Sequence, residues 1–153
     1  MPNTKWSTLT RLQLGQYGEY YAKMEFASYG YDVYTSEVDE HGVDFVAKSP
    51  VDGKYYEIQV KSLRNKGYVF VPKKQMCFSD TRLVVLVLFV DGSIPACYVI
   101  PSTEWITPNV LLVDRAYDKP GQKSRPEFGI NLSQKNLSLL QKYESGTYFE
   151  NCK

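Results

Sequence analysis

The most constraining stretch of the sequence is residues 42–61, GVDFVAKSPVDGKYYEIQVK. We predict a short strand at residues 44–47 and a second, longer strand at residues 55–62. Pro50 and Gly53 lie between them and predict a turn. A chain with this strand–turn–strand unit near its centre is expected to build a sheet around it.

Side chains on the second strand alternate between the two faces of the sheet, so Glu57, Gln59 and Lys61 share one face. The two residues between them are β-branched and point to the other face. A purely structural strand normally has a uniformly solvated polar face or a buried apolar one. An acid, an amide and a lysine together therefore indicate a functional hairpin, with Asp44 on its first strand.

The length and composition are those of one soluble globular domain. The chain has 153 residues, of which 43% are hydrophobic and 23% are charged. Its longest apolar run, residues 83–90, has the length of a strand, and the N-terminus lacks the layout of a signal peptide. Three widely spaced cysteines and one histidine argue against a disulfide framework and a thiolate zinc site. We expect a cytoplasmic single domain over residues 1–153, with a core at about 7–105 and a C-terminal elaboration at 106–153.

Charge is unevenly distributed although the net charge is only +1. Residues 1–60 contain five Lys and Arg against nine Asp and Glu, a balance of −4. Residues 61–82 contain six basic residues against one acid, a balance of +5, and the remainder is neutral. This arrangement suits a cation bound next to a polyanion.

A long helix is expected from residue 7 or 8 to residue 29, with Ser7 or Thr8 as its cap and Gly30 as its stop signal. Its predicted buried face carries one carboxylate, Glu19, which either meets a bound cation or pairs with a basic residue. The members of this face are Leu12, Gly15, Glu19, Ala22 and Phe26, and the neighbouring stripe of Tyr17, Tyr20, Tyr21 and Met24 widens it.

Further strands are predicted at residues 31–36, 67–72, 83–90 and 96–100, and residues 73–82 are ambiguous. We expect residues 67–72 to form a sheet edge and residues 114–127 to form a loop. The residues 131–133 are expected to cap a last helix at 134–143. The fold class is therefore α/β, with a mixed central sheet of about five strands flanked by helices.

Magnesium prefers oxygen ligands, usually one or two carboxylates completed by waters and substrate phosphate. Asp44 supplies one carboxylate and either Glu19 or Glu57 the second, while Gln59 and backbone carbonyls can supply neutral oxygens. Lys61 can orient the attacking water or stabilise charge on the phosphate. These groups predict hydrolysis of a phosphodiester with Mg²⁺, for which Mn²⁺ can substitute. The single histidine, His41, lies in a predicted turn without a nucleophile motif nearby.

The order of these residues resembles the PD-(D/E)XK nuclease superfamily over roughly residues 11–100, with its restriction-endonuclease-like core of a mixed sheet and flanking helices. It is most similar to small members with QxK in place of ExK, such as a cyanobacterial intron-encoded homing endonuclease. Archaeal Holliday-junction resolvases share the helical glutamate. The motif consists of Glu19 on the first helix, Gly42-Val43-Asp44, and Gln59-Val60-Lys61.

The resemblance implies that Asp44 is the main metal ligand, Glu19 the helical ligand and Lys61 the catalytic lysine. Gln59 stands at the second acidic position, which removes one carboxylate from the metal site. Metal affinity then depends on Asp44 together with Glu19 or Glu57. The residue before Asp44 is a valine where the family has proline.

The substrate expected from charge and from the resemblance is double-stranded DNA. Basic residues beyond the hairpin and in the loop at 114–127 are candidate DNA contacts, namely Arg64, Lys66, Lys73, Lys74, Arg115, Lys119, Lys123 and Arg125. Cutting both strands with one site per chain needs at least two copies, so we expect a homodimer or a homotetramer.

Two classes of function are left open by the sequence. The first is a Mg²⁺-dependent DNA endonuclease of the homing or restriction type, with junction resolution or repair as alternatives. The second is a non-catalytic DNA-binding module on the same fold, in which Glu19, Asp44 and Lys61 form a structural network. Metal binding through Asp44 would distinguish the two classes.

Overall fold

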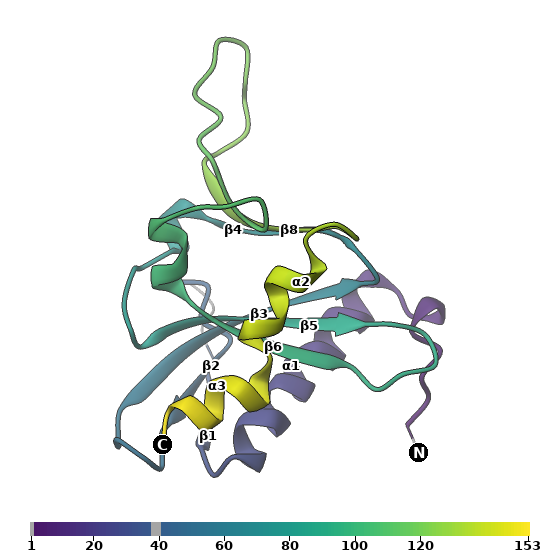
Figure 1. The fold of residues 1–153 in the computed structure, drawn as a ribbon, viewed down its shortest axis with the longest axis vertical. Coiled ribbons are helices and arrows are strands. Elements are labelled where there is room, and N and C mark those ends of the chain that lie inside the picture. Colours follow the sequence, from purple (N-terminus) through teal and green to yellow (C-terminus); the bar gives the residue numbers. More distant parts are fainter. Residues whose placement is uncertain (1, 38–40) are drawn as a thin grey trace.

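The computed structural model describes residues 2–37 and 41–153. Its centre is a five-stranded mixed sheet in the order β1-β2-β3-β5-β6, in which β3 and β5 are parallel and the other pairs are antiparallel (Figure 1). The strands are β1 Asp32–Thr35, β2 Phe45–Lys48, β3 Tyr55–Arg64, β5 Arg82–Phe89 and β6 Ala96–Pro101. The predicted fold class and its five-stranded sheet are confirmed.

Strand β5 is the most deeply buried element, since all eight of its residues are buried. Its continuous apolar sequence reflects two covered faces. Leu83, Val85 and Val87 pack in the core beneath helix α1, Arg11–Ser28. Val84 and Leu86 pack in a second core on the opposite face of the sheet.

Helix α1 begins later than predicted. Thr10 is its cap: the Thr10 hydroxyl accepts a hydrogen bond from the Gln13 backbone, and the Gln13 side chain accepts one from the Thr10 backbone. This reciprocal pair is a complete capping box. The predicted caps lie instead in a 3-10 turn, η1 Trp6–Thr8. The predicted stop at Gly30 is correct, and Gly30 has a φ of +87°.

The predicted buried face of α1 is only partly correct. Leu12 is 86% exposed, and Tyr20 and Met24 are also exposed. The buried stripe consists of Leu14, Gly18, Ala22 and Phe26, which recur every four residues. Small residues at its centre let α1 lie close to β3, and this close approach sets the rotation of the helix.

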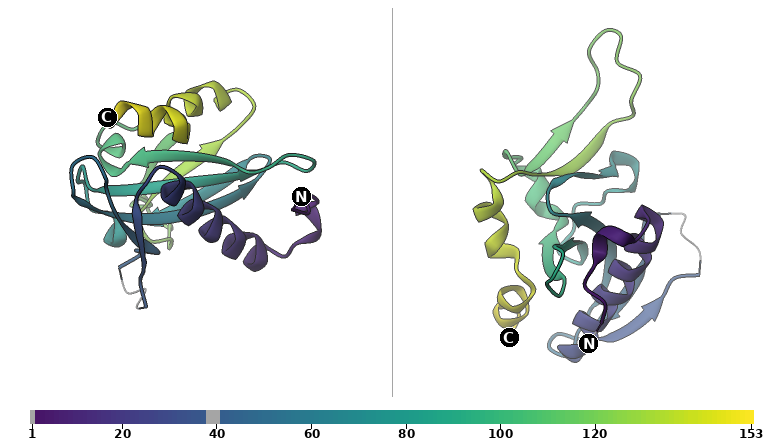
Figure 2. Two further views of the ribbon diagram at one scale, coloured as in Figure 1. Left: turned by 90° about the horizontal axis from the view of Figure 1, so that it is seen from below. Right: turned by 90° about the vertical axis from the view of Figure 1, so that its right-hand side faces the viewer.

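A second, three-stranded sheet in the order β4-β8-β7 packs on the face opposite α1. Its strands are β4 Gly67–Pro72, β7 Leu112–Arg115 and β8 Glu127–Leu132. The predicted edge position of residues 67–72 is confirmed, because β4 is an outer strand. The predicted loop at 114–127 is shorter, since its ends belong to β7 and β8. The remainder projects from the molecule as an arm, residues 116–126 (Figures 1 and 2).

The predicted last helix is divided into shorter segments. They are α2 Leu137–Leu140 and η4 Gln141–Tyr143, and a further helix that was not predicted, α3 Ser145–Asn151, follows them. Residues 131 and 132 do not cap a helix but pair with β4. Two short 3-10 turns, η2 Lys73–Gln75 and η3 Ser102–Ile106, complete the described structure. None of the helices within residues 2–37 and 41–153 is long and apolar enough to cross a membrane.

The two glycines of α1 provide a test of its packing on β3. A Cβ at Gly18 would lie 1.9 Å from Ser62 Oγ and 3.2 Å from Ser62 Cβ, whereas a Cβ at Gly15 would meet nothing within 4 Å. We expect Gly18→Ala to lower the free energy of unfolding by about 1–3 kcal/mol through overpacking. Gly15→Ala should raise it by about 1 kcal/mol through helix propensity.

Urea denaturation of the two variants measures both effects. Adding Ser62→Ala to Gly18→Ala should restore part of the loss, because the nearest clashing atom is then absent. Equal effects of the two glycine substitutions would contradict this contact between α1 and β3.

Candidate active site

Strands β2 and β3 part at Asp44. The Asp44 backbone N–H donates to the Ile58 carbonyl at 2.8 Å, and among the described residues this is the last backbone hydrogen bond in this direction between the two segments. The next donor on β3, the Val60 N–H, donates to Asp44 Oδ2 at 2.7 Å. A side-chain carboxylate therefore takes the place of a backbone carbonyl at the end of the ladder. This contact fixes the Asp44 carboxylate beside β3.

Gln59 lies opposite this junction and is 5% exposed. Its Oε1 atom is buried and has no hydrogen-bond partner within the described residues. Buried amide oxygens normally have a partner, because leaving one unsatisfied costs about 1–3 kcal/mol. The Gln59 oxygen is therefore a candidate ligand atom next to Asp44.

Gly42 is required beside Gln59. Its φ of +71° lies in the region that favours glycine. A Cβ at this position would lie 2.8 Å from Gln75 Oε1 and 3.2 Å from Gln59 Oε1. The glycine thus leaves space in front of the unpaired amide oxygen.

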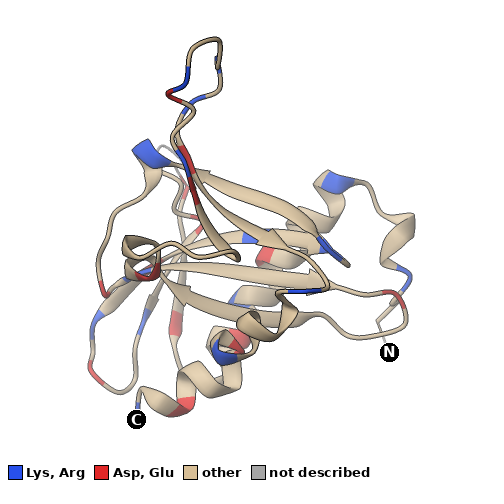
Figure 3. Ribbon diagram, turned by 45° about the horizontal axis from the view of Figure 1, so that its top comes forward, with Lys and Arg blue, Asp and Glu red and all other residues tan. Residues whose placement is uncertain are grey.

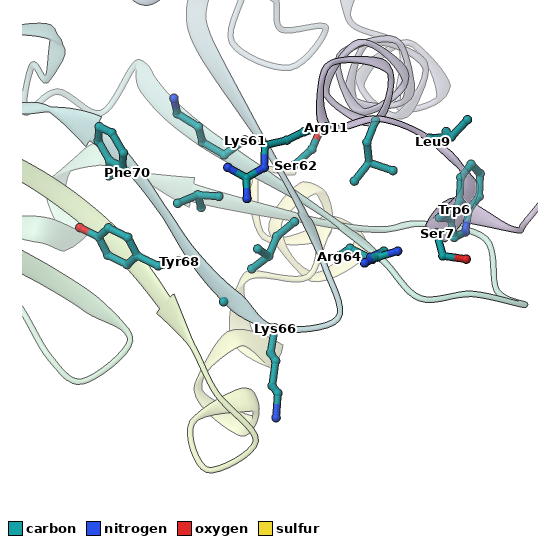
Figure 4. A pocket seen from close by; sticks show the side chains of 14 residues that line it. Trp6, Ser7, Leu9, Arg11, Lys61, Ser62, Arg64, Lys66, Tyr68 and Phe70 are labelled. Atoms are coloured by element: carbon teal, nitrogen blue, oxygen red, sulfur yellow. The ribbon is translucent and has the colours of Figure 1, made fainter.

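Lys61 is half-buried and lies two residues beyond Gln59, on the same face of β3. Figure 4 shows Lys61 on the wall of a pocket that also includes Arg11 and Ser62. The structure therefore places Asp44, Gln59 and Lys61 in one region, where β2 and β3 separate.

Glu57 shares this face of β3 but is bound to Arg82, with 3.1 Å between Glu57 Oε2 and Arg82 Nη1. Arg82 is 6% exposed and also donates to the carbonyl oxygens of His41 and Gln75, each at 2.8 Å. One buried guanidinium thus connects β3, the segment that leads to Asp44, and the turn η2. The role of Glu57 in the structure is to pair with Arg82.

Glu19 is 35% exposed at its side chain and pairs with Lys23, one turn later on α1, at 3.1 Å. It follows directly after Gly18, which packs against Ser62, the residue after Lys61. Because Gly18 contacts Ser62, its neighbour Glu19 lies on the part of α1 that passes over β3. Lys23 is 16% exposed at its side chain, and pairs at this spacing on a helix contribute about 0.2–0.5 kcal/mol, so Lys23 does not hold Glu19 strongly.

The donors at this junction fit a hard divalent cation. No group of three or more His, Cys, Asp and Glu side chains gathers as a metal site within residues 2–37 and 41–153. Mg²⁺ is commonly held by only one or two carboxylates, with waters and substrate phosphates as the other ligands. The Asp44 carboxylate and the unpaired Gln59 oxygen match this chemistry.

The predicted DNA contacts divide into three groups. Arg64 and Lys66 lie on the pocket with Lys61. Lys73 pairs with Asp114 at 2.5 Å, whereas Lys74 is exposed. The other predicted contacts are near or on the arm, where Figure 3 shows several basic positions: Arg115, Lys119, Lys123 and Arg125.

Arg115 differs from the other three residues of the arm group. Its guanidinium lies over the Tyr68 ring, 3.9 Å from the centroid, and a hydrogen bond with Tyr117 raises its pKa. Lys119, Lys123 and Arg125 are exposed. The structure therefore places Arg115 at the base of the arm and leaves the other three on its surface.

No family model matches the sequence, and no curated protein matches it. Among solved structures, the chain is similar to the bacterial homing endonuclease I-Ssp6803I, with 18% identity and a TM-score of 0.53. That match covers 93% of this chain and 92% of the other. The chain has the fold of this endonuclease.

A second similar structure is Hjc, a Holliday junction resolvase from Archaeoglobus fulgidus. The identity is 14%, the TM-score is 0.49, and the match covers 83% of this chain and 87% of the resolvase. The match to the homing endonuclease shows the fold that the sequence resemblance implied.

The sequence interpretation missed Arg82 as a residue of the site. Its signal in the sequence is a charged residue at the start of an otherwise apolar strand, RLVVLVLF. A charge that enters a buried strand needs partners, and here they are one carboxylate and two carbonyls. Its partners come from three separate segments and therefore could not be predicted.

Arg82 is expected to matter more to stability than its carboxylate partner. Arg82→Gln should lower the free energy of unfolding by about 2–4 kcal/mol, because it leaves two carbonyls without their charged donor. Glu57→Gln should lower it by less than about 1 kcal/mol, because the Glu57 side chain is 55% exposed. Chemical denaturation of both variants checks this order. Equal losses would show that the ion pair, and not the carbonyl contacts, is the main role of Arg82.

Proposed function

We propose that the protein is a Mg²⁺-dependent endonuclease that hydrolyses phosphodiester bonds of double-stranded DNA. The observation that carries the proposal is the junction of β2 and β3, where the Asp44 carboxylate, a buried unpaired oxygen of Gln59 and Lys61 lie together. The fold of a bacterial homing endonuclease supports this choice and favours site-specific cutting. Mn²⁺ is expected to substitute for Mg²⁺.

Asp44 and Gln59 would hold the metal, with a further carboxylate from Glu19. Bound Mg²⁺ polarises a phosphodiester and lowers the pKa of a coordinated water. Lys61 donates to the phosphate oxygens and stabilises the charge that develops on them. The backbone N–H of Val60 keeps the Asp44 carboxylate in one orientation.

Glu19 is the better choice for the second carboxylate. Glu57 is held by Arg82, which also binds two carbonyl groups and therefore cannot follow Glu57 toward a metal. Glu19 has only its pair with Lys23, one turn away on the same helix, to give up. This contrast supports Glu19 over Glu57 as the second carboxylate ligand.

The basic residues near the site and on the arm would contact DNA phosphates and fix the register of the duplex. Each chain has one site, so cutting both strands would need at least a homodimer. The cytoplasm is the compartment in which we propose that it acts.

Cleavage of supercoiled plasmid and of a four-way junction, with Mg²⁺ or with EDTA, tests the proposal. We expect cutting by the wild-type protein with Mg²⁺ only, and a loss of about a hundredfold or more in Lys61→Ala, because one charged donor to the phosphate is missing. Lys142→Ala, which removes an exposed lysine on η4, is the matched control.

Preference for the plasmid would support a homing or restriction role, and preference for the junction would support resolution. Metal-independent cutting, or cutting that persists in Lys61→Ala, would contradict the proposed chemistry. DNA binding without cutting of a library that contains the target site would instead support a non-catalytic module on this fold.

A further inference from the structure

A pocket of about 540 Å³ lies between the start of α1 and the hairpin formed by β3 and β4. Fourteen residues line it; four are basic and none is acidic. Figure 4 shows the four basic residues among the side chains that line the pocket: Arg11, Lys61, Arg64 and Lys66. A pocket with this balance of charge is suited to an anionic group.

The basic residues of the pocket other than Lys61 are exposed, and none of them is in a salt bridge in the part of the chain that the structure describes: Arg11, Arg64 and Lys66. Arg64 has an acid nearby, Asp91, whose pKa is lowered mainly by hydrogen bonds from Ser7 and also by the charge of Arg64. Cations gathered around one pocket repel one another, so an arriving anion would relieve this repulsion. DNA phosphates are the anions that the proposed function supplies.

Two aromatic rings of β4 form the wall of the pocket opposite α1. Tyr68 and Phe70 are on the same face of the strand, with ring centroids 6.1 Å apart and an interplanar angle of 19°. Phe70 is 46% exposed. An exposed ring beside unpaired cations is the combination that binds an unpaired base together with its phosphate.

The Tyr68 ring is held in place and cannot turn away. Its hydroxyl donates to Glu127, and Arg115 covers the ring at 3.9 Å. A Cβ at Gly129 would lie 2.3 Å from the ring, so the ring lies directly against the backbone of β8. Phe70 therefore packs beside a ring that is fixed in position, and part of the Phe70 ring stays exposed to solvent.

We propose that this pocket binds an unpaired nucleotide of a DNA strand, with its phosphates at Arg11 and Lys66 and its base against Phe70. The inference rests on the proposed nuclease function, because Lys61 is shared by the pocket and the candidate active site. A volume of about 540 Å³ suits one nucleotide, whereas a base within a duplex is stacked and paired and cannot reach the ring. The preferred substrate would thus carry unpaired DNA beside the cut.

Binding of fluorescent DNA in EDTA tests the inference without any need for cleavage. The probes are a short blunt duplex, the same duplex with an unpaired tail at either its 5′ or its 3′ end, and a longer blunt duplex with the same total charge. We expect one of the tailed probes to bind about tenfold more tightly than the blunt duplex of equal charge.

Phe70→Ala should abolish most of this preference, because the stacking ring is lost. It should leave the fold intact, since the Phe70 side chain is partly exposed. Arg11→Ala should reduce the preference through loss of a phosphate contact. Lys135→Ala, which removes an exposed lysine that does not line the pocket, is the matched control and should keep the preference.

Equal binding of tailed and charge-matched blunt DNA by the wild-type protein would overturn the pocket assignment and leave the nuclease proposal intact. A preference that persists in Phe70→Ala and Arg11→Ala would also overturn it. Failure to bind any of the probes, including a blunt duplex that contains the cleavage site, would overturn the proposed function itself.

Discussion

The hydrogen bond from the Val60 N–H to the Asp44 carboxylate is the contact on which the candidate active site depends. It ends the ladder between β2 and β3 with a side chain, so the two strands can separate without leaving a buried donor unsatisfied. The separation opens the space in which Gln59 and Gly42 meet. The same contact that satisfies the backbone also fixes the orientation of the proposed metal ligand.

Arg82 supports this junction from the other side. It binds the carbonyl of His41, one residue before Gly42, and so restrains the segment that carries Asp44. Arg82 also forms an ion pair with Glu57, which is one of the two acids predicted from the sequence as the second metal ligand. Glu57 thus pairs with a buried guanidinium from another strand, whereas Glu19 pairs with Lys23 on its own helix.

Local patterns predicted the main sheet well. The alternation on β3, the continuous apolar run of β5 and the turn signal at Gly53 depend on neighbouring residues, and each corresponds to an observed strand or turn. The rotation of α1 depends instead on the close approach of Gly18 to Ser62, which lies far along the chain. The second sheet was missed as a unit because β4 and β8 are more than fifty residues apart in sequence.

For the site, the spacing of Asp44, Gln59 and Lys61 predicted that these residues share one hairpin, which the structure bears out. The roles of Glu57 and Arg82 could not be predicted, because Arg82 lies 25 residues beyond Glu57 and its carbonyl partners carry no side-chain signal. The roles of Asp44, Gln59, Lys61 and Glu19 in chemistry stay predictions.

Calorimetric titration with Mn²⁺, in the absence of DNA, tests the central claim most directly. Asp44→Asn keeps an oxygen for the Val60 N–H and removes only the charge, so the variant should remain folded and bind Mn²⁺ at least about tenfold more weakly. Glu19→Gln should also weaken binding, and Glu57→Gln should not. Binding of Mn²⁺ by Asp44→Asn with wild-type affinity would contradict the proposed metal site.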